Sequence, residues 1–506
     1  MAKICVPVCV SHSDEMRDAI MAAAQFADII EIRADCLADP AAIAALLREC
    51  APETGRPLIV TMRSPEEGGR AQIDYDGRRL IWSSLNHSNA AYFIDIEVDL
   101  VRGFAAAESS ATVDWRRVIC SHHNFKRVPK DLAEILQQMA ATPARILKIA
   151  VQADDAVDCL PIFNLLDGTA AKGRQMIAIA MGEAGVMTRV LGPARGSFLT
   201  YGSLDDASGT APGQLTAKEL REVYRIDQIN SDTQVFGIIG QPVSHSLSPR
   251  IHNASFAAGG LNAVYIPFAV RDALQFIRRM AHPKTRELDW KLAGLSVTAP
   301  HKSTVIPALN WIDPAAKEIG AVNTIVVRDD QLLGYNTDAA GFIKPLRNML
   351  GSLKHVRCAI IGAGGAARAC SWALRAEGAA VTILARDINK RERLAAEFGV
   401  KCREFSGMPY SDFDVVINAT PVGMRGQLEN TTPAISAQLR GVQLAYDLVY
   451  NPIETRFLHE ARVAGCATIS GIEMLLAQAL EQFKLWRGEH ADIEVMRTAA
   501  MTGLSS

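Results

Sequence analysis

Short runs of branched apolar residues alternate with amphipathic stretches along the first 225 residues of the chain. Such runs are typical of buried β-strands, and the stretches between them repeat apolar residues at helical spacing. We predict eight strands, which begin near residues 3, 27, 57, 92, 117, 145, 176 and 198. Eight strands alternating with helices over roughly 220 residues predict a (β/α)8 TIM barrel. A doubly wound open sheet is the structural alternative, but it usually has fewer strands.

The stretch from 220 to 234 is polar and interrupts this pattern, so we place the end of the first domain at residue 225. A second α/β pattern follows. It includes the strand, turn and helix of "VRCAIIGAGGAARACSWAL", in which Gly362, Gly364 and Ala367 match the GxGxxA spacing. Glycines at this spacing allow a tight turn and place the helix N-terminus against a pyrophosphate. The context predicts a Rossmann dinucleotide-binding domain.

Composition narrows the class of protein. The chain has 506 residues, of which 49% are hydrophobic and 21% charged, and its net charge is −2. A nearly neutral chain is not expected to have nucleic acid or a membrane as its main partner. No apolar run approaches the roughly 18 residues of a membrane span, and the first residues resemble a strand rather than a signal peptide. We therefore expect a cytoplasmic protein.

The ten cysteines show no CxxC pair and no ligand spacing with histidine. We interpret them as small core residues in a reducing compartment, neither a disulfide framework nor a metal site. No metal is predicted.

Ionisable residues, with one glutamine, gather where the predicted barrel strands end, which is where the active sites of TIM barrels lie. In chain order they are Glu31, Arg33, Arg63, Glu67, His122, His123, Lys148, Arg189 and Gln214. Solvated surface alone does not explain so many of them on one rim.

Lys148 lies inside the apolar run "RILKIAV". Strand alternation puts Ile146, Lys148 and Ala150 on one face, so Lys148 points into the barrel if Leu147 packs under the helices. A lysine that reaches outward or pairs with a carboxylate is the simpler interpretation. Beside two arginines in an apolar cavity, however, the amine would lose its charge and become a Schiff-base nucleophile. Alternation sends one of the adjacent histidines inward without saying which.

The motifs "EIRAD", "TMRSPEEGG", "SHHNF", "LKIAV", "MGEAGVMTRVLG" and "TAPGQ" occur in the order and spacing of type I 3-dehydroquinate dehydratases, which this half resembles. The resemblance implies that Lys148 forms an imine with the substrate ketone, and that His123 is the general acid/base, held by Glu67. The substrate would be bound by Glu31, Arg33, Arg63, Arg189, Thr210 and Gln214. A Schiff-base aldolase, which also needs a barrel lysine, is the alternative for this half.

From about residue 235 onward the chain resembles shikimate dehydrogenases, through "SHSLSP", "SVTAPHK", "GAVNT", "NTD", "GAGGAARA", "NATPVGM", "YDLVYNP" and "GIEMLLAQA". The resemblance implies a catalytic pair, Lys302 and Asp338. It implies substrate contacts from Ser246, Ser248, Thr298, Asn323, Tyr450 and Gln478. It implies cofactor contacts from Gly362, Ala363, Gly364, Gly365, Ala366, Arg386, Lys390, Thr420 and Gly471.

The cofactor choice is open at one position. Arg386 favours the 2′-phosphate of NADP, whereas the adjacent Asp387 would repel it and favour NAD. Lys390 and Arg391 oppose that repulsion, so we expect NADP. Single-function dehydrogenases often have asparagine at the position of Ser296. The serine of this chain instead resembles the fused enzymes.

These resemblances imply a fused shikimate-pathway enzyme that dehydrates 3-dehydroquinate and reduces the product, 3-dehydroshikimate. The expected domains are the barrel at 1–225, a substrate-binding domain at 226–338 to which helices 471–506 return, and the NADP-binding domain at 339–470. Two alternatives remain: a quinate/shikimate dehydrogenase that uses NAD in the second half, and a non-catalytic sensor of a quinate-like ligand.

Overall fold

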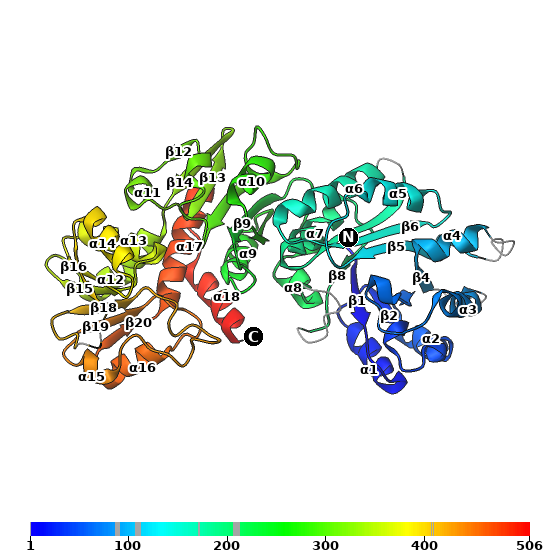
Figure 1. The fold of residues 1–506 in the computed structure, drawn as a ribbon, viewed down its shortest axis with the longest axis horizontal. Coiled ribbons are helices and arrows are strands. Elements are labelled where there is room, and N and C mark those ends of the chain that lie inside the picture. The colour runs from blue at the N-terminus through cyan, green and yellow to red at the C-terminus, as the bar shows by residue number, and fades with distance from the viewer. Residues whose placement is uncertain are drawn as a thin grey trace.

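The computed structural model describes residues 2–86, 92–106, 113–170, 173–205, 213–405, 407 and 409–505. Its described residues form one eight-stranded sheet in the first half of the chain and two six-stranded sheets in the second. The two halves lie side by side, with the first half in blue and cyan and the second from green to red (Figure 1). No helix in these residues is long and apolar enough to cross a membrane.

The first sheet is the predicted barrel. Its strands are β1 (Ile4–Val8), β2 (Ile29–Arg33), β3 (Leu58–Thr61), β4 (Tyr92–Glu97), β5 (Val118–Asn124), β6 (Ile146–Gln152), β7 (Gln175–Met181) and β8 (Thr200–Tyr201). They pair in parallel in the order β7-β6-β5-β4-β3-β2-β1-β8. A parallel bridge between Met176 and Ser197 closes the ring. The barrel is confirmed, and the open-sheet alternative is wrong.

Helices surround the barrel and bury its outer face. They are α1 (Ser13–Ala23), α2 (Ile43–Thr54), α3 (Tyr75–Asn86), α4 (Val98–Ala106), α5 (Leu132–Ala140), α6 (Leu160–Ala170), α7 (Val186–Leu191) and α8 (Ala217–Glu222). On β6, Leu147 and Ile149 belong to this outer core. Ile146 instead joins Ile119 and Ile177 in an apolar layer inside the barrel. Lys148 therefore points inward, as its alternation with Leu147 predicts.

The second sheet has the order β10-β9-β11-β13-β14-β12 and mixes parallel with antiparallel pairs. Its strands are β9 (Gln234–Gly240), β10 (Ala263–Ala269), β11 (Lys291–Val297), β12 (Trp311–Ile312), β13 (Thr324–Arg328) and β14 (Gln331–Tyr335). Its helices are α9 (Ser248–Ala258), α10 (Ala273–Phe276) and α11 (Pro314–Ile319).

The third sheet is parallel throughout, in the order β17-β16-β15-β18-β19-β20. Its strands are β15 (Arg357–Ile361), β16 (Ala380–Ala385), β17 (Lys401–Glu404), β18 (Val415–Asn418), β19 (Leu444–Asp447) and β20 (Ala467–Ile469). Numbered within the sheet, this order is 3-2-1-4-5-6, the Rossmann arrangement. Its helices are α12 (Asp338–Leu350), α13 (Gly365–Ala376), α14 (Ile388–Phe398), α15 (Ser436–Leu439) and α16 (Arg456–Val463).

The last two helices return to the second sheet. They are α17 (Gly471–Arg487) and α18 (Ile493–Ser505), coloured red in Figure 1. Trp486 on α17 donates its indole N–H to the carbonyl of Ile325 on β13, 3.0 Å away. The domain boundaries expected at 225, 338 and 470 fall outside all three sheets and stay predictions.

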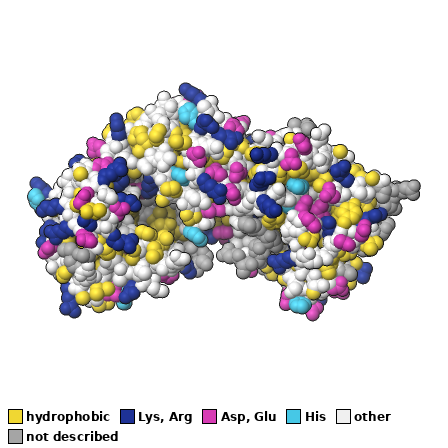
Figure 2. Space-filling view, viewed as in Figure 1, with side chains coloured by type: hydrophobic (Ala, Val, Ile, Leu, Met, Phe, Trp, Pro, Cys, Tyr) yellow, Lys and Arg dark blue, Asp and Glu magenta, His cyan; other side chains and the backbone are white. Residues whose placement is uncertain are grey.

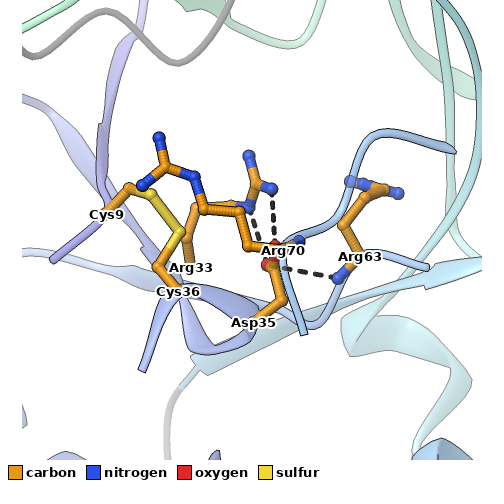
Figure 3. Close-up of a disulfide and its surroundings, with 6 residues drawn as sticks. All are labelled: Cys9, Arg33, Asp35, Cys36, Arg63 and Arg70. Atoms are coloured by element: carbon orange, nitrogen blue, oxygen red, sulfur yellow. Dashed lines mark hydrogen bonds and ion pairs between the residues drawn. A yellow bond between two sulfur atoms is a disulfide. The ribbon is translucent and has the colours of Figure 1, made fainter. Parts of the chain in front are cut away.

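One cysteine pair corrects the sequence analysis. Cys9 and Cys36 form a disulfide, with Cα atoms 5.4 Å apart, next to Arg33 and Asp35 (Figure 3). The prediction that no cysteine is disulfide-bonded is therefore wrong for these two, although the other eight are free. Cys9 follows β1 and Cys36 follows β2, and parallel neighbours end at the same edge of a sheet. A separation of 27 residues conceals this proximity in the sequence.

Candidate active sites

A first cavity opens at the carboxyl ends of the barrel strands. It is lined by eight residues predicted from the sequence: Glu31, Arg33, Arg63, Glu67, His123, Lys148, Arg189 and Gln214. Thr210 lies outside the described residues. His122, the other member of the histidine pair, is not on the wall of the cavity, and its Nδ1 lies 3.5 Å from Glu67. The structure thus brings together the groups that the sequence placed on one rim.

Three side-chain oxygen atoms accept hydrogen bonds from Lys148. Its Nζ donates to Oδ2 of Asp95 at 2.7 Å, to the hydroxyl of Tyr201 at 2.8 Å and to Oε1 of Glu31 at 3.4 Å. Lys148 thus points into the barrel and also pairs with carboxylates, the pairing that the sequence analysis gave as the simpler interpretation of this lysine. The carboxylate of Asp95 balances the ammonium charge of Lys148, so burial does not by itself require a neutral amine.

Asp95 is fully buried and stays ionised. Burial alone would raise its pKa, but the charges of Arg63 and Lys148 outweigh burial and hold this pKa well below its usual value. Arg63 approaches Oδ1 of Asp95 to 3.1 Å and donates to the hydroxyl of Ser121 at 2.7 Å. Asp95 therefore organises both cations at the centre of the barrel.

His123 is buried, and its imidazole is oriented by Glu67. Oε2 of Glu67 lies 3.0 Å from Nδ1 of His123 and also accepts the backbone N–H of His123 at 3.0 Å. Burial, with the charges of Arg63 and Lys148, lowers the pKa of His123 to about 4. Burial of Glu67 would raise its pKa, but hydrogen bonds from His122 and His123 lower it to about 2. At neutral pH His123 is uncharged, with its proton on Nδ1 toward the carboxylate, which leaves Nε2 able to accept a proton.

Arg189 on α7 is a buried cation on the wall of this cavity. It is 1% exposed, and its Nε and Nη2 have no hydrogen-bond partner among the described residues. Burial lowers its pKa to about 10, so the guanidinium is still charged at neutral pH. A buried, charged and unpaired fork of N–H groups on a cavity wall fits a carboxylate.

A second cavity, of about 1200 Å³, lies between the second and third sheets. Nine residues predicted from the sequence line it: Thr298, Lys302, Ala363, Gly364, Gly365, Ala366, Lys390, Thr420 and Tyr450. Burial raises the pKa of Tyr450, which keeps its hydroxyl protonated.

Lys302 and Asp338 form an ion pair beside this cavity. Nζ of Lys302 lies 2.5 Å from Oδ2 of Asp338, and Asn323 donates its amide N–H to the other carboxylate oxygen at 2.8 Å. Asn323 is fixed in turn, since its Oδ1 accepts the backbone N–H of Thr337 at 2.7 Å. The pair is therefore rigidly oriented, with the ammonium on the cavity side.

The glycine turn after β15 has the shape that a dinucleotide needs. Gly362 has φ +121°, and a Cβ there would approach the carbonyl of Ala419 to 2.9 Å, so no other residue fits without strain. A Cβ at Gly364 or Gly365 would meet nothing, which leaves open space at the start of α13. Backbone N–H groups at such a helix start bind phosphate.

Comparisons with known proteins identify the family of each half. Residues 4–231 match the family model "Type I 3-dehydroquinase". Three models match the second half: "Shikimate dehydrogenase substrate binding domain" at 238–325, "Shikimate / quinate 5-dehydrogenase" at 345–427 and "Shikimate 5'-dehydrogenase C-terminal domain" at 471–501. The chloroplastic bifunctional 3-dehydroquinate dehydratase/shikimate dehydrogenase of Arabidopsis thaliana is 34% identical over 97% of this chain and 83% of its own length. The chain belongs to this bifunctional family.

Single-function relatives match the second half alone. The shikimate dehydrogenase (NADP(+)) of Oleidesulfovibrio alaskensis is 40% identical over 54% of this chain and 96% of its own length. A crystal structure of a shikimate dehydrogenase in complex with NADP+ superposes with a TM-score of 0.52 at 38% identity, covering 55% of this chain and 98% of that one. We therefore call the two halves the dehydratase half and the dehydrogenase half.

Several predicted residues of the dehydrogenase half are not on the cavity wall. Besides Asp338 and Asn323, they are Ser246, Ser248, Gln478, Gly362, Arg386 and Gly471. Ser248 begins α9 and donates its backbone N–H to the hydroxyl of Ser246 at 3.3 Å. Gln478 donates its side-chain amide to the carbonyl of Leu475 on α17. Gly471 lies behind the wall, because a Cβ there would approach the carbonyl of Val449 to 2.5 Å.

The structure adds residues that the sequence analysis did not name. In the dehydratase half they are Asp95 and Tyr201, which contact Lys148 directly. Asp95 had a detectable signal, since a carboxylate in the strand "YFIDIE" is as anomalous as a lysine in "RILKIAV". In the dehydrogenase half, Arg368 and Arg393 join Lys390 on the cavity wall. Lysine and arginine side chains are numerous on the face of this half shown in Figure 2.

Proposed function

We propose that Lys148 forms an imine with the ketone of 3-dehydroquinate, that water is then eliminated, and that 3-dehydroshikimate is reduced at Lys302 and Asp338 with NADPH. The contact of Lys148 with Asp95 and Tyr201, inside a cavity shared with His123, carries the first part of this proposal. An amine on an inward strand position, facing a cavity with an acid/base, is the arrangement that imine chemistry requires.

The dehydration uses this chain's residues in sequence. Nζ of Lys148 loses a proton to His123 and attacks the ketone carbon. His123 returns that proton to the former ketone oxygen, which leaves as water to give a protonated imine. The imine withdraws electrons from the neighbouring C–H, whose proton passes to Nε2 of His123. The substrate hydroxyl leaves as a second water, to which His123 returns the proton. Hydrolysis of the imine frees Lys148 and 3-dehydroshikimate, while Arg189 holds the carboxylate.

The reduction depends on the ion pair beside the second cavity. Bound NADPH supplies the hydride. Lys302 donates the proton that the developing alkoxide requires, and Asp338 orients Lys302 and balances its charge. The open backbone at Gly364 and Gly365 and the cations Lys390 and Arg393 fit the phosphate groups of a dinucleotide.

A trapping experiment tests the imine. Borohydride added with 3-dehydroquinate should reduce the imine and add the mass of the substrate skeleton to the peptide that contains Lys148. Lys148→Met should abolish both the labelling and the dehydration while retaining shikimate oxidation with NADP. Undiminished dehydration by Lys148→Met would exclude the covalent route, and an unmodified wild-type chain would favour a sensor.

A second assay separates shikimate from quinate as the substrate of the dehydrogenase half. Initial rates of oxidation are compared for shikimate and quinate, each with NADP and with NAD. The proposal expects the highest kcat/KM for shikimate with NADP. Faster oxidation of quinate with NAD would identify the quinate dehydrogenase alternative.

A further inference from the structure

A carboxylate of the dehydratase half contacts the turn that precedes α9 in the dehydrogenase half. Oε1 of Glu183 accepts the backbone N–H of Val243 at 2.7 Å and that of Ser244 at 2.5 Å. Glu183 begins the short 3-10 helix that follows β7, on the rim of the barrel cavity. Two charge-assisted hydrogen bonds donated to one carboxylate oxygen fix the turn more firmly than water would.

Val243 anchors this turn to the core and to Ser246. Its side chain is buried in the core at 3% exposure, and its carbonyl accepts the backbone N–H of Ser246 at 3.1 Å. The hydroxyl of Ser246 accepts the N–H of Ser248. A continuous series of hydrogen bonds therefore joins Glu183 to the two serines expected to bind substrate. His245, within the same turn, lines the second cavity together with Lys302.

The other side of Glu183 touches the wall of the first cavity. Met181 lines that cavity, and Gly182 packs so closely on Gly213 that a Cβ at Gly213 would lie 2.3 Å from the Gly182 backbone. Gln214, next in the chain, is on the cavity wall as well. The segment 181–183 thus lies between the dehydratase cavity and the 243–246 turn of the dehydrogenase half, which we call the substrate turn.

We propose that Glu183 of the dehydratase half is a positioning residue for shikimate binding in the dehydrogenase half. It acts by holding the 243–246 turn, so that the hydroxyls of Ser246 and Ser248 meet the substrate in one arrangement. The inference rests on the substrate role proposed for these serines. Without Glu183, the two N–H groups would be left to water and the turn would be free to adopt other conformations.

The halves also meet at other points, which provide a control. Arg195 of the barrel donates to the carbonyl of Asp289 at 2.6 Å, before the amino end of β11 and away from the substrate turn. Arg195→Ala loosens the contact between the halves without touching the 243–246 turn. Glu183→Gln keeps an oxygen that can accept both N–H groups, whereas Glu183→Ala removes it.

The test measures steady-state shikimate oxidation by the full chain with NADP. Glu183→Ala should raise the KM for shikimate at least fivefold, with less than a twofold change in the KM for NADP and in dehydratase kcat. Glu183→Gln should restore the shikimate KM to within about twofold of the wild type, and Arg195→Ala should leave it unchanged.

Two results would overturn the inference: an unchanged shikimate KM in Glu183→Ala, or an equal rise in Glu183→Ala and Arg195→Ala, which would indicate general loosening of the halves. Retained dehydratase activity and an unchanged NADP KM show that a variant is folded. A wild-type chain that does not oxidise shikimate would instead refute the proposed function itself, so the two failures are distinguishable.

Discussion

Asp95 and Lys148 form a 2.7 Å ion pair inside the barrel, from β4 and β6, with β5 between them. The pair supplies a buried ammonium with a counter-ion and, with Arg63 on the other carboxylate oxygen, holds the amine in place. The amine must still lose a proton before it attacks a ketone. Asp95 is a weak acceptor for that proton, since its pKa is held well below the usual value by Arg63 and Lys148. The uncharged His123 on the same cavity wall is the better acceptor.

Removing the charge of Asp95 should therefore impair the dehydratase half alone. In Asp95→Asn both Lys148 and Arg63 lose a buried counter-ion. Such a loss typically lowers the free energy of unfolding by about 3–5 kcal/mol. We expect dehydratase kcat/KM to fall at least tenfold and borohydride labelling of Lys148 to slow, with shikimate oxidation unchanged. Asp99→Asn, at an exposed position on α4, is the matched control. Equal dehydratase kinetics in the two variants would show that Asp95 has no part in the reaction.

The pH dependence of the dehydratase should report the environment of His123. Its pKa is lowered to about 4, so the neutral form that accepts a proton predominates above that pH and is lost as the pH falls through about 4. An ordinary histidine would lose activity near its usual pKa of about 6.5. We expect the acid limb of kcat/KM to lie well below pH 6, measured with circular dichroism to exclude unfolding. A limb centred near pH 6.5 would show that burial does not depress this pKa.

The sequence was sufficient for the number of barrel strands, for the face on which a strand residue lies and for the position of the glycine turn. Strand alternation oriented Lys148 and Leu147 correctly, and the strand–glycine–helix pattern located the turn at Gly362. It was insufficient for contacts between residues that lie on different strands of the sheet. Asp95 reaches Lys148 across an intervening strand, and Cys9 reaches Cys36 because two parallel strands end together. Neither relation has a fixed spacing in the sequence, so only the register of the strands reveals it.

The disulfide should stabilise the arginine site at the mouth of the barrel. The segment from Ala34 to Cys36 carries Asp35, whose carboxylate accepts from Arg33 at 2.7 and 2.8 Å and from the backbone N–H groups of Arg63 and Arg70 (Figure 3). Replacing both Cys9 and Cys36 by serine should reduce the free energy of unfolding by about 2–4 kcal/mol.

The same double variant should raise the KM for 3-dehydroquinate, since Arg33 would be less firmly held. Urea unfolding and steady-state kinetics measure the two effects. The free, half-buried Cys402 in the third sheet provides the control, Cys402→Ser, which should change neither quantity. Reductant should reproduce the double variant's KM in the wild-type chain, and the absence of any effect from either treatment would mean that the pair does not support the site.

Asp387 should limit the preference for NADP over NAD. Its carboxylate caps α14 by accepting the backbone N–H of Lys390 at 3.1 Å, and its Oδ2 lies 3.6 Å from Nζ of the same residue. Lys390 lines the cofactor cavity, so Asp387 offsets a charge that would otherwise attract a 2′-phosphate. Asp387→Ser retains a side-chain cap for the helix and removes the negative charge.

We expect Asp387→Ser to lower the KM for NADP by about twofold to fivefold, the size of an exposed charge effect, and to leave the KM for NAD unchanged. The gain should shrink at high salt, because exposed charges are screened. Asp412 is another exposed carboxylate, in the connection between β17 and β18 of the same sheet. Asp412→Ser should alter neither KM. If Asp387→Ser changes both KM values equally, Asp387 acts only as a helix cap, and the cofactor preference comes from the cations on the cavity wall.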